Sequence, residues 1–203
     1  QEAAELRSRG ITAPILILSE PTTDLSRDIL KLNLSQTVYT YHYAKLLDQA
    51  GKKEGKVAKV HIKIDTGMNR IGVSLKDALH LIEQILELEN VEIEGIFSHF
   101  PSSDKLNDAK TIHQIEAFEH LVKIVKGKGI PIRLFHLANS LGTRNYLDSH
   151  FDMVRIGHDM YAGTLTFKSK VAYIHEVEKG ETISYGRDYT VDKSARIATI
   201  SVG

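Results

Sequence analysis

Polar residues, charged residues and glycines follow four successive strand-like runs of this sequence, at the points where the runs end. They are Asp65, Thr66, Gly67, Asn69 and Arg70 after the first run, Ser98 and His99 after the second, His136, Asn139 and Ser140 after the third, and Arg155, Gly157 and His158 at the fourth. In parallel α/β folds, ligands bind at the carboxyl ends of the strands. One polar loop residue would carry little weight, but four such strand ends predict a ligand-binding or catalytic site.

Each candidate also has a purely structural interpretation. Lys63 lies inside the strand-like run HIKID and could extend its amine from a sheet edge, while Arg70 could be a surface loop residue. His99 could be a hydrogen-bonded core histidine, and Ser140 could cap the helix after its strand. Arg155 is harder to explain in this way, because it lies among apolar residues in DMVRIGHDMY and its permanent charge needs a partner.

Composition excludes several classes of protein. The 203 residues carry 26 basic and 26 acidic side chains, and this zero net charge argues against nucleic acid or an anionic membrane as the main partner. The absence of cysteine rules out disulfides and thiolate metal sites, and we predict no metal. No apolar run approaches the roughly 18 residues of a membrane span, and no signal-peptide pattern opens the chain. We expect a cytoplasmic protein.

The elements that must position these residues alternate along the chain. Strand-like runs are interpreted at 14–20, 37–41, 56–65, 91–100, 132–140 and 151–157. Helical patterns cover 1–10, 21–33, 43–51 (closed by Gly51), a segment that begins after Ser74 with Asp77 as a capping partner, and 109–129. The alternation predicts right-handed βαβ units and a parallel sheet, either doubly wound or part of a (β/α)₈ barrel.

A barrel typically takes about 250 residues, so six units would leave about two missing. After about Thr164 the helical period disappears and alternation with glycine turns predicts the start of an antiparallel β domain. We therefore predict a partial (β/α)₈ barrel over residues 1–163 and the beginning of a β domain over 164–203. Because residue 1 is glutamine and residue 203 falls inside a strand-like run, we expect a piece of a longer protein.

Several motifs occur together in a characteristic order: KIDTGMNRIG, SHF followed by SD, HLANS, VRIGHDMYAG and SYGRDYTVDKSARIATISVG. Together they resemble the alanine racemases, pyridoxal 5'-phosphate (PLP) enzymes built from an (α/β)₈ barrel and a C-terminal β domain. The resemblance covers the whole chain. It departs from the family at His158, where an aliphatic residue is usual, in PSSD in place of ATAD, and in a shorter linker after MYAGT.

The resemblance implies roles for two arginines. Arg70 matches the arginine that reaches the phenolic oxygen of PLP and helps to place the substrate carboxylate. Lys63 matches a lysine that many members carry as a carbamate, an anion that would orient Arg70, whereas two unmodified cations would repel each other. Arg155 matches the arginine that faces the pyridine nitrogen and keeps it unprotonated, with His136 as its support.

The resemblance also implies a phosphate site and a catalytic position. Ser140, with the backbone amides of Gly157 and His158 and with Asn139 in support, would hold the phosphate. His99 would lie beside the ring, near the acid–base tyrosine. The family's cofactor-bound lysine is expected upstream of residue 1 and its tyrosine downstream of residue 203, acting in the partner subunit of a homodimer. We therefore expect the chain alone to be inactive.

The resemblance implies interconversion of L- and D-alanine by two-base proton transfer, with cell-wall (peptidoglycan) synthesis as the family's setting. Another PLP protein of the same barrel type is an alternative, either a serine racemase or a PLP-homeostasis carrier, although residues 165–203 argue against a carrier because it normally lacks the β domain. A sugar-phosphate barrel enzyme is a third possibility, but it would leave Lys63 and Arg155 without a role.

Overall fold

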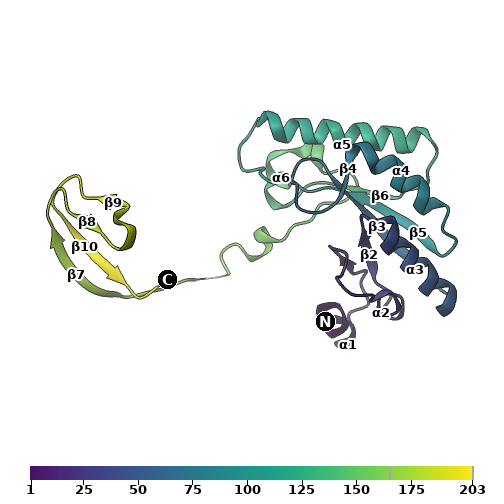
Figure 1. Cartoon of the computed structure of the whole chain (residues 1–203), viewed down its shortest axis with the longest axis horizontal. Coiled ribbons are helices and arrows are strands. Elements are labelled where there is room, and N and C mark those ends of the chain that lie inside the picture. Colours follow the sequence, from purple (N-terminus) through teal and green to yellow (C-terminus); the bar gives the residue numbers. More distant parts are fainter. Residues whose placement is uncertain (165, 203) are drawn as a thin grey trace. The chain divides into compact units, whose positions relative to one another are not determined.

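The computed structural model describes residues 1–164 and 166–202, and the chain divides into two compact units, Gln1–Met160 and Tyr161–Gly203 (Figure 1). The predicted boundary between residues 163 and 164 stays a prediction, and residues 165 and 203, in the predicted linker and last strand, lie outside the described residues. Within the described ranges, no helix is both long and apolar enough to cross a bilayer.

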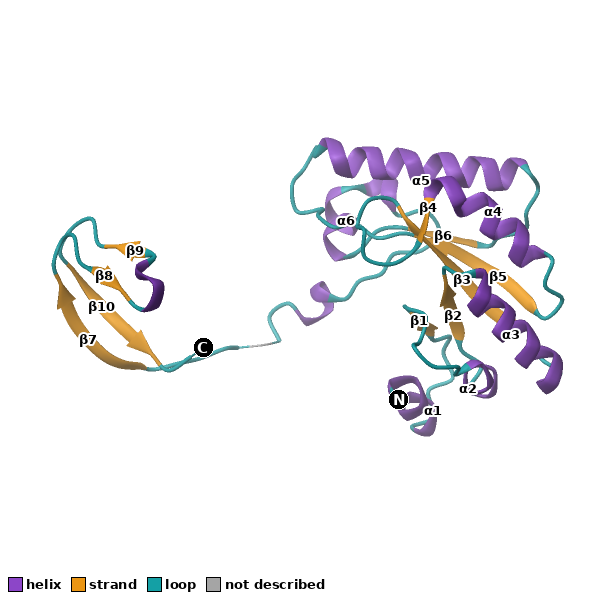
Figure 2. Cartoon of the chain, viewed as in Figure 1, coloured by secondary structure: helices purple, strands orange, loops and turns teal. Residues whose placement is uncertain are grey.

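The first unit is built on a parallel sheet whose strands follow one another in chain order. Its members are β1 (Leu16–Ile17), β2 (Ser35–Val38), β3 (Ala58–Asp65), β5 (Val91–Phe97) and β6 (Leu134–His136), and β4 (Val73–Ser74) pairs with the end of β3 (Figure 2). A doubly wound sheet reverses its strand order at a switch point, whereas consecutive barrel units do not. The unit is therefore a partial (β/α)₈ barrel, as predicted.

Helices connect the strands and cover the sheet (Figure 2). They are α1 (Glu2–Ser8), α2 (Ser26–Lys31), α3 (Tyr41–Glu54), α4 (Leu75–Leu86), α5 (Ala109–Gly127) and α6 (Ser140–Asn145), with short 3₁₀ turns at Leu147–Ser149 and His158–Tyr161. Ser74 is the N-cap of α4, as predicted, but its hydroxyl donates to Asp77 Oδ2 at 2.6 Å and not to the backbone. Ala78, Ile82 and Ile85 of α4 are buried in the core.

The predicted end of α3 at Gly51 is wrong. The helix continues to Glu54 and closes at Gly55, whose φ of 64° lies in the left-handed region that glycine tolerates. Gly51 is needed for another reason, since a Cβ there would lie 2.6 Å from the Lys56 carbonyl oxygen. The sequence contained two glycines, and packing decides which of them ends the helix.

The strand predicted over residues 151–157 is not a strand in the structure. The segment runs beside β6, and the amides of Asp152 and Arg155 donate to Phe135 O and Ala138 O at 2.9 and 3.0 Å. The Phe135 N–H, which a pairing strand would use, donates instead to the Asp152 carboxylate at 2.8 Å. Because a side chain takes this donor and the two backbone bonds are three residues apart, no regular ladder forms.

The second unit is antiparallel, as predicted. Its strands β7 (Val171–Val177) and β10 (Ala195–Ile200) pair with each other, and the short strands β8 (Thr182–Ile183) and β9 (Tyr189–Thr190) form a second pair. A 3₁₀ turn at Tyr185–Arg187 connects β8 to β9. This unit is the start of a C-terminal β domain.

Candidate functional site

The strand ends of the first unit surround a cavity of about 600 Å³. Every residue to which the family resemblance assigns a role lines it, except His136. The full lining is Leu18, Lys63, Arg70, Ile71, Phe97, His99, Asn139, Ser140, Leu141, Arg155, Ile156, Gly157 and His158. The other strand-end candidates do not line the cavity: Asp65, Thr66, Gly67, Asn69 and Ser98. The predicted site residues in this lining lie up to almost a hundred positions apart in the sequence, and the fold brings them together as the rule for the carboxyl ends of parallel strands predicts.

Lys63 does not reach a sheet edge but points into the cavity from β3. Its side chain is buried, with 2% of the residue exposed, and Nζ donates to Ile64 O at 3.1 Å and lies 5.3 Å from the centre of the Phe97 ring. Burial lowers the pKa of Lys63 to about 8, and the positive charges of Arg155 and Arg70 lower it further than Asp65 can offset. The site therefore holds an amine that is easily deprotonated.

Arg70 is placed by a tight loop after β3. One oxygen of the Asp65 carboxylate accepts hydrogen bonds from the backbone amides of Gly67, Met68 and Asn69 at 2.8, 2.9 and 3.1 Å. These three bonds hold the chain in a tight turn. Gly72 then lets the chain pass closely over β3, since a Cβ there would lie 2.9 Å from the Asp65 nitrogen. Arg70 is exposed at the rim of the cavity.

Arg155 is held from several sides. Its Nη2 donates to Ser98 O at 2.6 Å and to Leu137 O at 3.1 Å, and its Nη1 donates to His136 Nδ1 at 2.6 Å. Burial lowers the pKa of Arg155 to about 10, so the guanidinium stays charged at neutral pH. The sequence analysis expected a partner for the charge of Arg155. The structure provides neutral acceptors instead, so the site keeps a net positive charge.

Two histidines beside Arg155 are neutral. Burial and the charge of Arg155 lower the pKa of His99 to about 4 and that of His136 to about 2. His99 Nδ1 lies 3.2 Å from Arg155 Nη2. Because a guanidinium can only donate, His99 Nδ1 is the acceptor and its Nε2 carries the proton.

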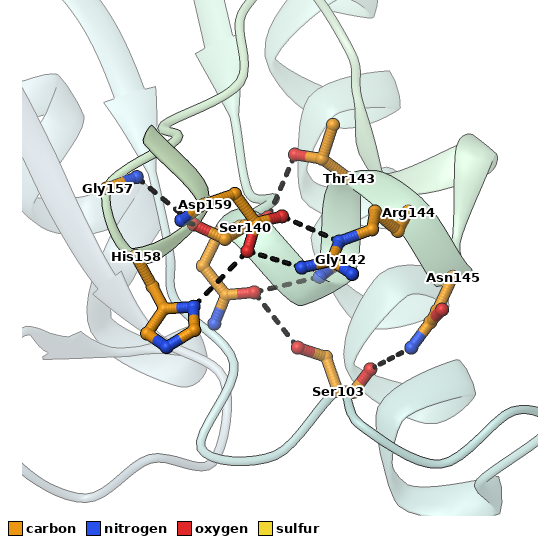
Figure 3. Close-up of polar contacts among 10 residues, drawn as sticks. Ser103, Ser140, Gly142, Thr143, Arg144, Asn145, Gly157, His158 and Asp159 are labelled. Atoms are coloured by element: carbon orange, nitrogen blue, oxygen red, sulfur yellow. Dashed lines mark hydrogen bonds and ion pairs between the residues drawn. The ribbon is translucent and has the colours of Figure 1, made fainter. Parts of the chain in front are cut away.

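The loop after β6 forms a polar cup (Figure 3). Asn139, not Ser140, caps α6, and its Oδ1 accepts from the Gly142 amide at 2.9 Å. The Ser140 hydroxyl accepts the amides of Gly157 and Asp159 at 3.1 and 3.4 Å. The capping role considered for Ser140 is therefore wrong, and its hydroxyl lies against the predicted phosphate-binding backbone.

An ion pair fixes the outer part of this cup. The Arg144 guanidinium donates to the Asp159 carboxylate, with Nε at 2.6 Å from Oδ2, and the exposed His158 ring lies 3.2 Å from Asp159 Oδ1 (Figure 3). Sequence reasoning did not identify Arg144 or Asp159. Nothing in their local pattern distinguishes them from surface charges.

Three interior residues were also not identified: His61, Glu94 and Phe97. For two of them a signal existed. His61 lies two residues before Lys63 on β3, so period-two alternation puts both on one face of the strand, and Phe97 ends β5 two residues before His99. Phe97 contacts both Lys63 and Arg155, with the Arg155 Cζ 5.0 Å from the ring centre, and stacks on His136 at 4.7 Å. Glu94, on β5, lies 3.3 Å from His61 and completes this interior group.

The fold and the cavity define a class: a (β/α) barrel with a cationic pocket at its strand ends, followed by an antiparallel β domain. Family models named "Alanine racemase, N-terminal domain" and "Alanine racemase, C-terminal domain" match residues 1–164 and 164–203. The chain belongs to the alanine racemase family.

Individual relatives agree with the family models. Alanine racemase 2 of Caldanaerobacter subterraneus subsp. tengcongensis is 37% identical over all of this chain and 56% of its own length. The solved alanine racemase of Clostridium difficile 630 has a TM-score of 0.76 at 31% identity, over 97% of this chain and 56% of that one. A histidine racemase of Leuconostoc mesenteroides shares the fold, with a TM-score of 0.67 at 24% identity over 100% of this chain and 58% of that one. The chain thus spans little more than half the length of these relatives.

Proposed function

We propose that the chain is the cofactor-facing part of an alanine racemase, a PLP-dependent enzyme that interconverts L- and D-alanine by two-base proton transfer. The observation that carries the proposal is the convergence of Lys63, Arg70 and Arg155 on one cavity with the amide cup around Ser140. The names of the family and of the aligned relatives support alanine as the substrate.

The chemistry of the cavity fits PLP. The charged side chains that line it are all cationic, and of the described residues no carboxylate lines it. PLP offers a phosphate, a phenolic oxygen and a pyridine nitrogen, all of which accept hydrogen bonds. The volume of about 600 Å³ also falls within the range of small-molecule sites, about 300–1,000 Å³.

When bound, PLP supplies an electron sink that acidifies the α-carbon of the amino acid. Arg155 would face the ring nitrogen, where a guanidinium with a pKa of about 10 donates a hydrogen bond without giving up its proton. Arg70 would hold the phenolic oxygen and the substrate carboxylate, and His99 would lie beside the ring. The Ser140 hydroxyl, with the Gly157 and His158 amides and supported by Asn139, would hold the phosphate.

Lys63 is proposed to react with CO₂. A pKa of about 8 leaves part of the amine neutral at pH 7, and only the neutral amine attacks CO₂. The Nζ–C bond forms, one proton is released, and the product is a carbamate anion. This anion would replace the repulsion between Lys63 and the two arginines by attraction and would orient Arg70.

The acid and the base are proposed to come from outside this chain. Of the described residues that line the cavity, none is a tyrosine, and Lys63 is the only lysine. We therefore expect racemisation only in the full-length protein, proposed to be a cytoplasmic homodimer that supplies D-alanine for peptidoglycan.

The test compares the 203-residue chain with the full-length gene product. The full-length protein should develop a visible absorbance band with PLP that borohydride abolishes, and should racemise L-alanine in a circular dichroism assay. The chain alone should show no turnover. Turnover by the chain, or a full-length protein that neither binds PLP nor racemises alanine, would contradict the proposal.

Another amino-acid racemase is the alternative, because a solved histidine racemase shares this fold. Serine stays within this alternative, while the antiparallel unit with β7 and β10 argues against a PLP-homeostasis carrier. Assays of L-alanine, L-serine and L-histidine at equal concentration distinguish these candidates, and the highest kcat/KM should belong to alanine.

A further inference from the structure

A line of hydrogen bonds runs from the cavity into the interior of the sheet. It begins with Arg155 Nη1, 2.6 Å from His136 Nδ1, and continues from His136 Nε2 to His61 Nδ1 at 2.8 Å. It ends with His61 Nε2, 3.3 Å from Glu94 Oε2. Resting on the function proposed above, we propose that Glu94 and His61 are positioning residues, which act through His136 to hold the Arg155 guanidinium toward the cofactor ring.

A glycine makes the line possible. His61 lies on β3 and His136 on β6, and β5 runs between these two strands. His61 pairs in register with Gly95 of β5, and a Cβ at Gly95 would lie 2.5 Å from His61 Nδ1 and 2.6 Å from Cε1. The imidazole therefore occupies the space of the missing side chain and crosses β5 to reach His136.

The chemistry of the two ends fixes the direction of the line. A guanidinium only donates and a carboxylate only accepts, so each histidine between them must accept at Nδ1 and donate from Nε2. A protonated imidazole would place donor against donor. Burial lowers the pKa of both His61 and His136, which keeps both rings neutral.

Glu94 is itself firmly held. Its Oε2 accepts from the Ser35 hydroxyl at 2.6 Å and its Oε1 accepts from Arg133 Nη2 at 3.0 Å, with Lys59 Nζ at 3.8 Å. Burial acts to raise the pKa of Glu94, but the hydrogen bonds from Ser35 and His61 and the charge of Lys59 bring it below its ordinary value. An ionised, immobile acceptor therefore terminates the line.

At the other end, the line helps to determine which donors of Arg155 remain available. The Nη2 group faces Ser98 O, Leu137 O and His99 Nδ1, and one Nη1 hydrogen faces His136. Within the described part of the chain, the Nε–H and the second Nη1 hydrogen donate to no protein acceptor. If the His136 bond weakens, the Nη1 end of the guanidinium is no longer held, and these free donors lose their direction.

The test uses histidine-labelled full-length protein and three variants. Nitrogen NMR of the wild type should show His61 and His136 as neutral Nε2–H tautomers, with and without PLP. Glu94→Leu should mix the tautomers of His61, speed exchange of the His136 Nε2 proton, and raise the PLP dissociation constant about tenfold. Glu94→Gln retains an acceptor, so its histidine tautomers, its His136 proton exchange and its PLP affinity should stay close to those of the wild type. Glu92→Leu, which removes an exposed carboxylate from the same strand, is the matched control.

Nδ1–H tautomers or charged rings in the wild type would overturn the proposal. So would Glu94→Leu with wild-type NMR signals and PLP affinity, or a loss in Glu92→Leu as large as in Glu94→Leu. If Glu94→Leu does not fold, His61→Phe provides the same test, because an apolar ring of similar size should speed exchange at His136 and weaken PLP binding while Glu94 is unchanged.

Failure of the proposed function is recognised separately. A wild-type protein that binds no PLP refutes that function, whereas the tautomers and the proton exchange of His136 are still measured in the same samples. PLP binding by the wild type with no response to Glu94→Leu refutes only the positioning role.

Discussion

The cavity has two cationic walls that are built in opposite ways. On one wall, Arg155 is enclosed by β5 and β6 and donates to two backbone carbonyls and two imidazoles. On the other wall, Arg70 stands exposed on a loop whose geometry depends on Asp65 and Gly72, and within the described residues its guanidinium donates no hydrogen bond. The Arg155 side chain is therefore fixed by hydrogen bonds before a ligand binds, whereas Arg70 is placed at the rim of the cavity by its loop alone.

This difference fits the two tasks proposed above for Arg155 and Arg70. A group that sets the electronic state of a cofactor benefits from a fixed position, since its hydrogen bond must keep its length and direction. A group that meets an exchanging substrate must release it again, and a loop permits the necessary movement. Substitutions at the two walls should therefore differ in how they divide their effects between stability and ligand affinity.

The largest effect is expected from Arg155→Met. Removal of the guanidinium leaves His136 Nδ1, Ser98 O and Leu137 O buried without their donor. Each unsatisfied acceptor costs about 1–3 kcal/mol, so we expect the free energy of unfolding to fall by about 4 kcal/mol. Guanidinium chloride unfolding measures this, and a loss below about 1 kcal/mol would mean that the wall is not held by these bonds.

Lys63→Met should change the dependence of stability on pH. In CO₂-free buffer the pKa of Lys63 falls from 10.5 to about 8 on folding, so the unfolded chain binds more protons between these values. The free energy of unfolding of the wild type should therefore rise by about 3 kcal/mol as the pH rises from about 8 to 10.5. Below pH 8, the whole destabilisation caused by the buried Lys63 charge should be present. Lys63→Met should lack this rise. Unfolding midpoints between pH 7 and 10.5 measure it, and parallel curves for the two proteins would contradict the prediction.

Gly72→Ala tests the loop that carries Arg70. Gly72 has a φ of 127°, and the added Cβ would lie 2.9 Å from the Asp65 nitrogen. Strain of this kind costs about 1–3 kcal/mol, so we expect a loss of stability of about 2 kcal/mol. Gly10→Ala is a useful control, because it also has a positive φ, of 82°, but meets no atom within 4 Å. Equal losses in both variants would show that backbone strain alone, and not the close approach to β3, is responsible.

The smallest effect on stability is expected from Arg70→Met. Exposed residues without a structural bond usually change the free energy of unfolding by less than about 0.5 kcal/mol. In the full-length protein the same substitution should nevertheless weaken PLP binding and raise the KM for alanine. A stability loss comparable to that of Arg155→Met would remove the distinction between the two walls.

The sequence was sufficient to predict the parts that follow from local periodicity and from one topological rule. Parallel strands that alternate with helices must place Lys63, His99 and Ser140 at the same edge of the sheet, and the structure has them around one cavity. Arg155 lines the same cavity although its segment, 151–157, is not a strand. Their individual roles came from the family resemblance and stay predictions.

The errors and omissions have a common physical cause, which is contact between residues distant in sequence. A Cβ at Gly51 would lie 2.8 Å from the Asn90 Cβ, so this glycine is required by packing and does not mark the end of the helix. Residues 151–157 form no ladder because the Asp152 carboxylate takes a donor of Phe135. The line from Glu94 to Arg155 depends on the register that sets His61 opposite Gly95. Register is a property of two paired strands and cannot be predicted from the sequence of either strand alone.

The lowered pKa of Lys63 should make its amine more nucleophilic near neutral pH than that of an ordinary lysine. A lysine with the ordinary pKa of about 10.4 keeps its nitrogen lone pair protonated to a much greater extent near neutral pH. A small electrophile that fits the cavity, such as the isocyanic acid that accumulates in aged urea, should therefore mark Lys63 ahead of a lysine with the ordinary pKa. The residue offers a handle for a spectroscopic tag, and peptide mapping after a brief cyanate pulse would show its selectivity among the lysines.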